Sequence, residues 1–281
     1  MFRFLFICLL WALAVFNSAY SSAQVMLYAD GPGNTYELIN SILAPGYTAM
    51  ETPDMTNGTH AAFGRHIAEV YDSTLKRNVF EFYIHALLDN DVSTLESDRQ
   101  RVEIKTYSSS PKNLKGDTGE TMTFKWKFKL PTGFKPSSNF THIHQIKAVD
   151  GDDSSPLFTL TPRKGSSGGA DQLQLIYVAD SATSSNVVNT INLSLLLNTW
   201  VEVTEVIKVG SKGTYSITIN KLSNGTNLMT YSNANIKTIR PSNSFIRPKW
   251  GIYRSLNDVG NLRDDSIRFA DFSIAEDCNC N

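Results

Sequence analysis

The sequence predicts an all-β protein, built as a sandwich or jelly roll of two antiparallel sheets. Short segments rich in Val, Ile, Thr, Phe and Tyr recur along the chain, each bounded by Gly, Asn, Asp, Ser or Pro. Helical periodicity is nearly absent, and no helices alternate with these segments. Strands in such numbers bury their apolar faces most simply when two sheets pack face to face.

The alternation within one segment shows why strands are expected. From Thr123 to Lys129 every second side chain is aromatic and the others are Thr or Lys, so one face packs on a core and the other meets solvent. Only Tyr36–Leu43 suggests a short helix. The expected strands are Val79–Leu87, Arg101–Tyr107, Thr121–Leu130, Thr141–Val149, Leu157–Thr161, Leu173–Val178, Trp200–Val209, Tyr215–Ile219, Leu228–Tyr231, Trp250–Tyr253 and Ile267–Ile274.

Residues 1–23 are expected to form a secretory signal peptide. Arg3 precedes an apolar run from Phe4 to Phe16, and small and polar residues ending at Ala23 follow it. Cleavage before Gln24 would leave one domain, residues 24–281, because no linker rich in Pro, Gly and Ser divides this stretch. The mature protein is therefore expected to be secreted and extracellular.

The composition excludes some partners and leaves a few features open. With a formal net charge of −1, the chain gives no general reason to bind nucleic acid or a membrane, and we expect a monomer with neither partner. Cys8 belongs to the signal peptide, and a disulfide framework cannot be built from Cys278 and Cys280 at the C-terminus alone. Possible N-glycosylation sites, which act only in a eukaryotic source, begin at Asn57, Asn139, Asn192 and Asn224.

Three strand-forming segments carry polar side chains where a simple sheet would not. In the first, Arg101, Glu103 and Lys105 share one face of an extended chain, while Val102 and Ile104 face the core. Such a row forms either cross-strand ion pairs or part of a binding site. The sequence by itself leaves both interpretations open.

The second and third segments are similarly ambiguous. In the second, His142 and His144 lie on one face and Gln145 and Lys147 on the other, and either face could line a cleft. Two histidines on a half-buried strand could equally be satisfied core or edge residues. In the third segment Lys249, Gly251, Tyr253 and Ser255 share a face, and the glycine leaves room above the sheet for a ligand or another backbone.

The order and spacing of these segments resemble the motif strands of the jelly-roll polysaccharide lyases. The alginate lyase motifs run Arg-Thr/Ser-Glu-Leu-Arg, Gln-Ile/Val-His and Tyr-Phe-Lys-Ala-Gly-Val/Ile-Tyr-Asn-Gln; glucuronan lyases and the smaller heparin lyases are similar in architecture. The corresponding residues here are Arg101-x-Glu103-x-Lys105, Gln145-Ile-Lys147 and Lys249-x-Gly251-Ile-Tyr253. The resemblance implies a concanavalin-A-like sandwich that cleaves an acidic, uronic-acid-containing polysaccharide by β-elimination.

The resemblance also implies roles for the matched residues. Arg101 would bind the uronate carboxylate, Gln145 would assist it, and Tyr253 would transfer a proton. Substrate binding is expected from Glu103, Lys105, Lys147, Lys249 and Arg254.

The general base is left open, because Lys147 stands where the alginate lyases have histidine. His144 and His85 are the alternative candidates, although His144 faces the other way by strand periodicity. Cations around Tyr253 are expected to favour its phenolate form, which would let the tyrosine act as base, acid or both.

The chemistry explains why such residues are needed. Removing the weakly acidic C5 proton of a uronate becomes easier when Arg101 and an amide such as Gln145 neutralise the neighbouring carboxylate. No cofactor or metal is required by this scheme. An acidic turn at Asp150, Asp152 and Asp153 could nevertheless hold a structural calcium ion.

Two other functions fit a secreted sandwich, because one fold hosts many functions. A non-catalytic, lectin-like carbohydrate-binding protein would need stacking aromatic residues but no proton-transfer group. A glycoside hydrolase would need two carboxylates flanking the scissile bond, about 5–9.5 Å apart. Glu103 is available, but Glu202 and Glu205 fall on opposite faces of a strand, so the hydrolase ranks last.

Overall fold

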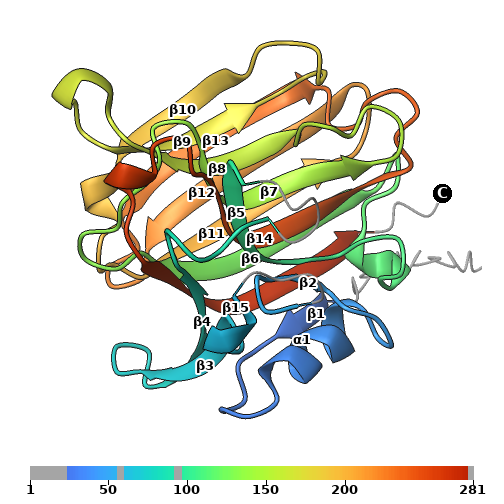
Figure 1. The fold of residues 1–281 in the computed structure, drawn as a ribbon. Coiled ribbons are helices and arrows are strands. Elements are labelled where there is room, and N and C mark those ends of the chain that lie inside the picture. Colours follow the sequence, from blue (N-terminus) through green and yellow to red (C-terminus); the bar gives the residue numbers. More distant parts are fainter. Residues whose placement is uncertain (1–23, 56–59, 92–96, 278–281) are drawn as a thin grey trace, which may run out of the picture.

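The computed structural model describes residues 24–55, 60–91 and 97–277. In this part of the chain two antiparallel β-sheets pack face to face, as the sequence predicts (Figure 1). The expected signal peptide, the sequon at Asn57, and Cys278 and Cys280 lie outside the described residues. No helix in the described ranges is long and apolar enough to cross a membrane.

The larger sheet has eight strands. Seven of them form a continuous path, and the N-terminal strand β1 (Gln24–Leu27) pairs with β15 beside it. The path runs through β13 (Asn227–Ile236), β12 (Gly213–Lys221), β11 (Val201–Lys208), β6 (Thr121–Lys129), β15 (Asp265–Asp277), β4 (Arg77–Ile84) and β3 (Ile67–Asp72).

The second sheet has seven strands and carries all three of the polar segments described above. Its order is β10 (Asn186–Asn192), β9 (Gln172–Tyr177), β8 (Phe158–Arg163), β7 (Thr141–Val149), β14 (Phe245–Ser255), β5 (Arg99–Lys105) and β2 (Met50–Glu51).

Within the described residues, helices are few and short. The predicted helix is found as α1 (Thr35–Leu43), which buries Tyr36, Ile39 and Leu43 on one side. This spacing of three and four residues is typical of a helix that packs one stripe against a core. The single-turn 3₁₀ helices are η1 (Ala61–Phe63), η2 (Lys112–Leu114), η3 (Ser166–Gly168), η4 (Leu193–Leu195) and η5 (Val259–Asn261).

The core lies between the two sheets and is rich in aromatic side chains. From β6 of the larger sheet, Phe124 and Trp126 are buried, and Trp126 lies 5.9 Å from the ring of Trp250 on β14 of the other sheet. Phe158 on β8 stacks on Tyr215 of β12 with ring centroids 3.7 Å apart. These contacts hold the sheets together by apolar burial and aromatic packing.

A buried polar link also joins the two sheets. His144 on β7 is 2.9 Å from a carboxylate oxygen of Glu205 on β11, and its other ring nitrogen is 2.9 Å from the carbonyl oxygen of Lys249. Tyr215 donates a hydrogen bond to Glu205. His144 is therefore an interior residue, and the expectation that it could serve as a catalytic base is wrong, because its side chain faces the core of the sandwich.

All eleven predicted strands occur, although their ends move by a few residues. The largest change is at Trp250–Tyr253, which is the middle of the longer strand β14. Four strands were not predicted: β1, β2, β3 and β10. Strand β2 has only two residues, and β10 is rich in asparagine and largely exposed, so neither carries the usual signal of alternating burial.

Two predictions concern the surface. The sequon residues Asn139, Asn192 and Asn224 are exposed, so each is accessible for modification. In the acidic turn, Asp150 accepts a hydrogen bond from the Ser244 hydroxyl and Asp152 accepts one from the backbone N–H of Ser181. A calcium ion at this turn stays a prediction.

Candidate active site

The three polar segments of the sequence become three neighbouring strands. Strand β14 pairs with β7 on one side and with β5 on the other, so it is the middle strand of the three. Tyr253 on β14 lies opposite Arg101 on β5 and opposite His142 on β7. Lys249 on β14 lies opposite Gln145 on β7. Residues far apart in the sequence are thus gathered on the outer face of one sheet.

Direct contacts link the residues that the lyase resemblance singles out. The guanidinium carbon of Arg101 lies 4.0 Å from the centre of the Tyr253 ring, within the range of a cation–π contact. Gln145 donates a hydrogen bond from its amide to Glu103, and Glu103 lies 3.5 Å from Arg101. Arg101 therefore contacts Tyr253 directly, and Gln145 is joined to Arg101 only through Glu103.

Gly251 allows β14 and β5 to approach each other closely. It has a φ of 147°, a conformation that side-chain-bearing residues rarely adopt, and a Cβ atom there would lie 2.0 Å from the carbonyl oxygen of Val102 on β5. The pairing of β14 with β7 also shifts register between Trp250 and Tyr253. The glycine thus admits the neighbouring backbone, one of the two uses expected from the sequence.

Three cations and three carboxylates form a buried network under the site. Arg101 pairs with Glu51 at 3.0 Å and with Asp91 at 2.8 Å. Lys249 pairs with Glu51 at 2.5 Å and with Glu103 at 2.7 Å. The third cation, Lys105, lies 2.8 Å from Glu51.

This network changes the roles of two residues that were expected to bind substrate. The side chains of Glu103 and Lys249 are 0% and 2% exposed, so they hold the network together rather than reach a ligand. The charge of Arg101 is likewise shared among carboxylates. Arg101 is therefore better placed to hold Tyr253 than to cancel the charge of an incoming uronate.

Tyr253 is kept in its neutral form. Burial raises the pKa of its phenol, and although Arg101 and Arg99 act in the opposite direction, burial outweighs them. Arg99 donates a hydrogen bond to the phenol oxygen at 3.1 Å. The expectation that nearby cations favour the phenolate is therefore wrong for the resting protein: Tyr253 has a proton to give.

His142 is the imidazole next to Tyr253. Its ring centroid is 6.0 Å from that of Tyr253, and it stacks on Phe140 at 5.0 Å. Its Nδ1 is 2.8 Å from the Thr161 hydroxyl, whereas its Nε2 has no hydrogen-bond partner among the residues that the structure describes. Burial, together with the nearby cations Arg163, Arg101 and Lys249, lowers the pKa of His142 to about 3. At neutral pH it is an uncharged imidazole with a ring nitrogen free to accept a proton.

Further cations on the same sheet lack a carboxylate partner. Within the described ranges, Lys147, Arg247 and Arg163 form no ion pair with a carboxylate, and burial lowers the pKa of each. Lys147 lies opposite Arg247 in the pairing of β7 with β14. Nearby carboxylates such as Glu51 and Asp153 act on Lys147 and Arg247 without pairing with them, and an acidic ligand would supply close ion pairs.

Lys147 is too distant along the strand to act on the same atom as Tyr253. Its partner Arg247 lies six positions before Tyr253 on β14. Six residues of an extended strand span roughly 20 Å. The position that is histidine in the alginate lyase motif therefore holds a lysine remote from Tyr253, and the imidazole facing Tyr253 comes from a different position, His142.

Two further predicted site residues lie elsewhere. Arg254 is fully buried between the sheets, where it donates to the side chain of Gln100 and to the carbonyl oxygen of Arg263. The expectation that it binds substrate is wrong, because alternate residues of β14 face the interior. His85 follows β4 in the other sheet and contacts the carboxylate of Asp89, not Tyr253.

Glu202 and Glu205, the glutamates considered for a glycoside hydrolase, are not paired with each other. Glu205 is buried against His144, whereas Glu202 on the opposite face of β11 forms an ion pair with Lys127 at 3.3 Å. The expectation that these two glutamates face opposite sides is confirmed. They cannot flank one sugar.

Comparisons with known proteins show what this fold resembles. No protein-family model matches the chain, and no curated protein matches its sequence. Solved structures do match. A marine alginate lyase of polysaccharide lyase family 14 from Aplysia kurodai is 12% identical, with a TM-score of 0.58 over 89% of this chain and 97% of that one.

Two further structures have the same arrangement. An endo-β-1,4-glucuronan lyase from the fungus Trichoderma reesei is 16% identical, with a TM-score of 0.51 over 74% of this chain and 86% of that one. An alginate lyase from Pseudomonas aeruginosa is 15% identical, with a TM-score of 0.50 over 81% of this chain and 97% of that one. At these identities the likeness establishes the jelly-roll fold of the polysaccharide lyases.

Proposed function

We propose that this protein is a secreted polysaccharide lyase that cleaves a uronic-acid-containing polysaccharide by β-elimination. The observation that carries the proposal is the pairing of a neutral phenol, Tyr253, with a neutral imidazole, His142, on the outer face of the sheet. The fold supports it, since structures with this architecture include lyases of alginate and of glucuronan. The apolar N-terminal segment Phe4–Phe16 supports export.

The proposed reaction needs one base and one acid. Nε2 of His142 removes the proton from C5 of the uronate, and the electrons of the C–H bond form the double bond between C4 and C5. The C4–O bond breaks, and the Tyr253 phenol gives its proton to the departing oxygen. Solvent then returns the proton from His142 to Tyr253, so that both groups end in their starting forms. Each proton transfer by a placed group typically contributes 10²–10⁴-fold.

Arg99 and Arg101 stabilise the charge that develops on Tyr253. Arg99 already donates to the phenol oxygen, and Arg101 lies beneath the ring, so a transient phenolate would form between two cations. Gln145 is 3% exposed and donates its amide to Glu103, so it would act by holding the network beneath the site rather than by binding the uronate carboxylate. Charge on the neighbouring sugars would be bound by Lys147, Arg247 and Arg163.

The test is product formation from a panel of polyuronates that includes alginate and glucuronan. We expect an unsaturated product that absorbs in the ultraviolet. Reducing ends without unsaturation would indicate a hydrolase, and binding without any product would indicate a lectin-like protein; either result would overturn the proposal.

The assignment of Tyr253 is tested by Tyr253→Phe, which keeps the ring over Arg101 and removes only the phenolic proton. We expect kcat to fall by about 10²-fold or more, with unchanged thermal unfolding. Tyr71→Phe is the matched control, because Tyr71 is 64% exposed on β3 of the other sheet. Full activity of Tyr253→Phe would remove this residue from the mechanism.

A further inference from the structure

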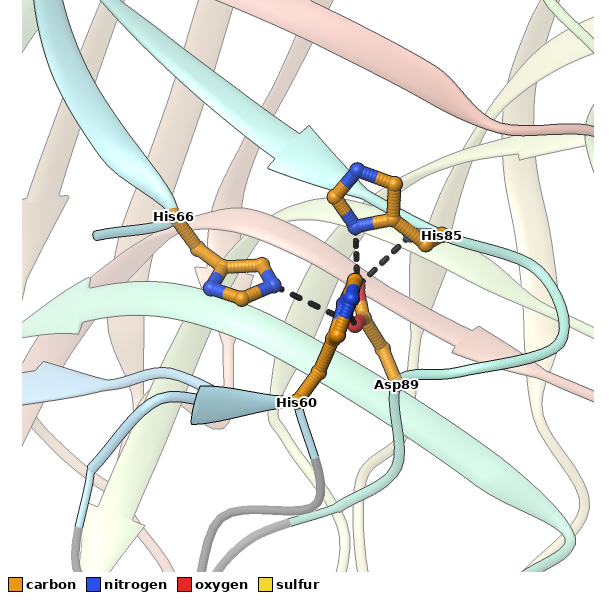
Figure 2. A group of neighbouring side chains, drawn as sticks. All are labelled: His60, His66, His85 and Asp89. Carbon is orange, nitrogen blue, oxygen red and sulfur yellow. Dashed lines mark hydrogen bonds and ion pairs between the residues drawn. The ribbon is translucent and has the colours of Figure 1, made fainter. Parts of the chain in front are cut away.

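A second cluster of titratable side chains lies apart from Tyr253. It consists of His60, His66, His85 and Asp89, and so contains three of the chain's five histidines. His60 precedes η1, His66 precedes β3, and His85 and Asp89 follow β4. Figure 2 shows the three imidazole rings arranged around the carboxylate of Asp89.

The four side chains point their donor atoms at a common centre. Nδ1 of His60 is 2.8 Å and Nε2 of His66 is 3.2 Å from one oxygen of Asp89, while Nδ1 of His85 is 3.2 Å from the other. One donor atom from each residue lies within 4.8 Å of all the others. Four ligands at the usual zinc bond lengths, arranged as a tetrahedron, are about 3.3 Å apart. A contraction of up to about 1.5 Å in these separations would complete such a shell.

Contacts on the side of the ring away from Asp89 fix the orientation of His66. Its Nδ1 faces two acceptors, a carboxylate oxygen of Asp54 and the carbonyl oxygen of Gly64, both at 3.0 Å, so Nδ1 carries a hydrogen. Tyr36 in turn donates to Asp54 at 2.9 Å. A carboxylate behind a metal-binding histidine is the arrangement that fixes the tautomer and leaves Nε2 as the ligand.

The cluster is also shielded from water. The side chains of His66 and Asp89 are 0% exposed, and those of His60 and His85 are 13% and 15% exposed. Phe63 packs against the imidazoles, with its ring centroid 4.2 Å from that of His85. Without a metal, His66 would need a proton on both ring nitrogens, because each nitrogen faces an oxygen atom. A proton on Nε2 of His66 would therefore compete with a metal ion for the same position.

We propose that His60, His66, His85 and Asp89 bind one zinc ion as a closed, structural site. Three imidazoles and one carboxylate suit zinc, whereas calcium and magnesium prefer shells made of oxygen atoms alone. Four protein ligands leave no open position, which is typical of structural rather than catalytic zinc.

The position of the site indicates what the ion would stabilise. Gln100 on β5 donates to the backbone carbonyl oxygens of His85 and Asp89 at 2.9 and 3.1 Å. Two residues after Asp89, Asp91 pairs with Arg101. A zinc ion would therefore fix the turn between His85 and Asp91 against the strand that carries Arg101.

Metal analysis of the purified full chain tests the proposal directly. We expect about one zinc per chain, loss of that zinc on treatment with a strong chelator, and its recovery on dialysis against zinc chloride. Zinc at about 100 times its dissociation constant should raise the Tm of the stripped protein by about 5–10 °C. Calcium chloride at the same concentration should leave the Tm unchanged.

Variants separate the cluster from adventitious binding. His60→Gln and His85→Gln remove the two partly exposed ligands, and each should lower zinc content at least tenfold with an unchanged far-ultraviolet circular dichroism spectrum. His142→Gln, a histidine outside the cluster, is the matched control and should retain the metal. A stripped wild-type protein that neither takes up zinc nor changes its Tm would overturn the proposal, as would full zinc content in both variants. If a ligand variant does not fold, the zinc uptake and Tm shift of the wild-type protein decide the question.

Discussion

His142 shows how strongly surroundings set the chemistry of a single residue. The same imidazole in water would be half protonated near pH 6.5. Here burial and three nearby cations lower its pKa to about 3. Nearly all of His142 is therefore already in the neutral, proton-accepting form at mildly acidic pH.

This shift predicts an unusual pH profile. For a histidine base with a pKa of about 3, kcat/KM should stay level as the pH falls from 7 to about 5 and should decline only as the pH approaches 3. His142→Gln should lower kcat by about 10²-fold or more, because the amide cannot take the proton. Initial rates in overlapping buffers measure both effects. An acidic limb centred near pH 6.5 would contradict this role.

The same shift has a stability consequence with a definite sign. Because the folded-state pKa of His142 is below the unfolded value, the unfolded chain binds more protons between about pH 3 and 6.5. The contribution of this residue therefore favours folding at neutral pH and is lost progressively as the pH falls through that window.

Among the elements, β14 determines the geometry of the candidate site. It lies between β5 and β7 and presents Tyr253 to one side of the sheet and Trp250 to the core. These two residues are three positions apart, so ordinary alternation places them on opposite faces, and the register shift in the pairing with β7 brings His142 opposite Tyr253. A regular strand would offer no such close approach to the backbone of β5.

Gly251→Ala should therefore damage both fold and activity. The added Cβ would meet the Val102 carbonyl oxygen at 2.0 Å and would occupy a residue whose φ is 147°. We expect a loss of more than about 2 kcal/mol in the free energy of unfolding, measured by urea denaturation. Gly260→Ala is the control, since a Cβ there meets nothing within 4 Å. Equal stability of the two variants would show that the backbone of β5 can move to accommodate the added Cβ.

On the scale of the whole molecule, two kinds of contact hold the sheets together. Most of the interface is apolar, as with Trp126 against Trp250. The link from His144 to Glu205 and Tyr215 crosses the same space with hydrogen bonds. Such a buried polar link restricts how one sheet can slide on the other, because each polar group must keep its partner.

Glu205→Gln tests how much this link contributes to the free energy of unfolding. Removing one partner of a buried, hydrogen-bonded pair typically costs about 3–5 kcal/mol, and we expect a loss in that range from equilibrium urea unfolding. Glu202→Gln on the same strand is the matched control, because Glu202 is partly exposed and should change stability by less than about 1 kcal/mol. Indistinguishable variants would mean that packing alone fixes the sheets.

Much of the architecture could be predicted from local pattern. Alternation such as that of Phe124, Trp126 and Phe128 identifies a half-buried strand without knowledge of its neighbours. Weak strands carry no such pattern, and one of them, β2, supplies Glu51 to the network around Arg101. A two-residue strand is too short to show an alternation of side chains. Only its pairing with β5 identifies it.

The candidate site was predicted only in part. The order of the motifs led to Arg101 and Tyr253, which are in contact, and to Gln145, which is joined to Arg101 through Glu103. Spacing along the chain led to Lys147 as the counterpart of a catalytic histidine, whereas register places His142 opposite Tyr253. Which side chain of a strand meets a given neighbour depends on pairing and bulges, and a single sequence does not encode these locally.

The sequence by itself determined the all-β class, most of the strands and the polar segments that differ from an ordinary sheet face, because these follow from side-chain periodicity within a few residues. Only the tertiary structure decided that Arg101 is shared among carboxylates, that Arg254 and His144 are interior, and that His60, His66, His85 and Asp89 meet. These facts depend on contacts between residues distant in the chain and on the burial that such contacts create. Burial sets which groups carry charge, and so the chemistry of the site was decided by the fold.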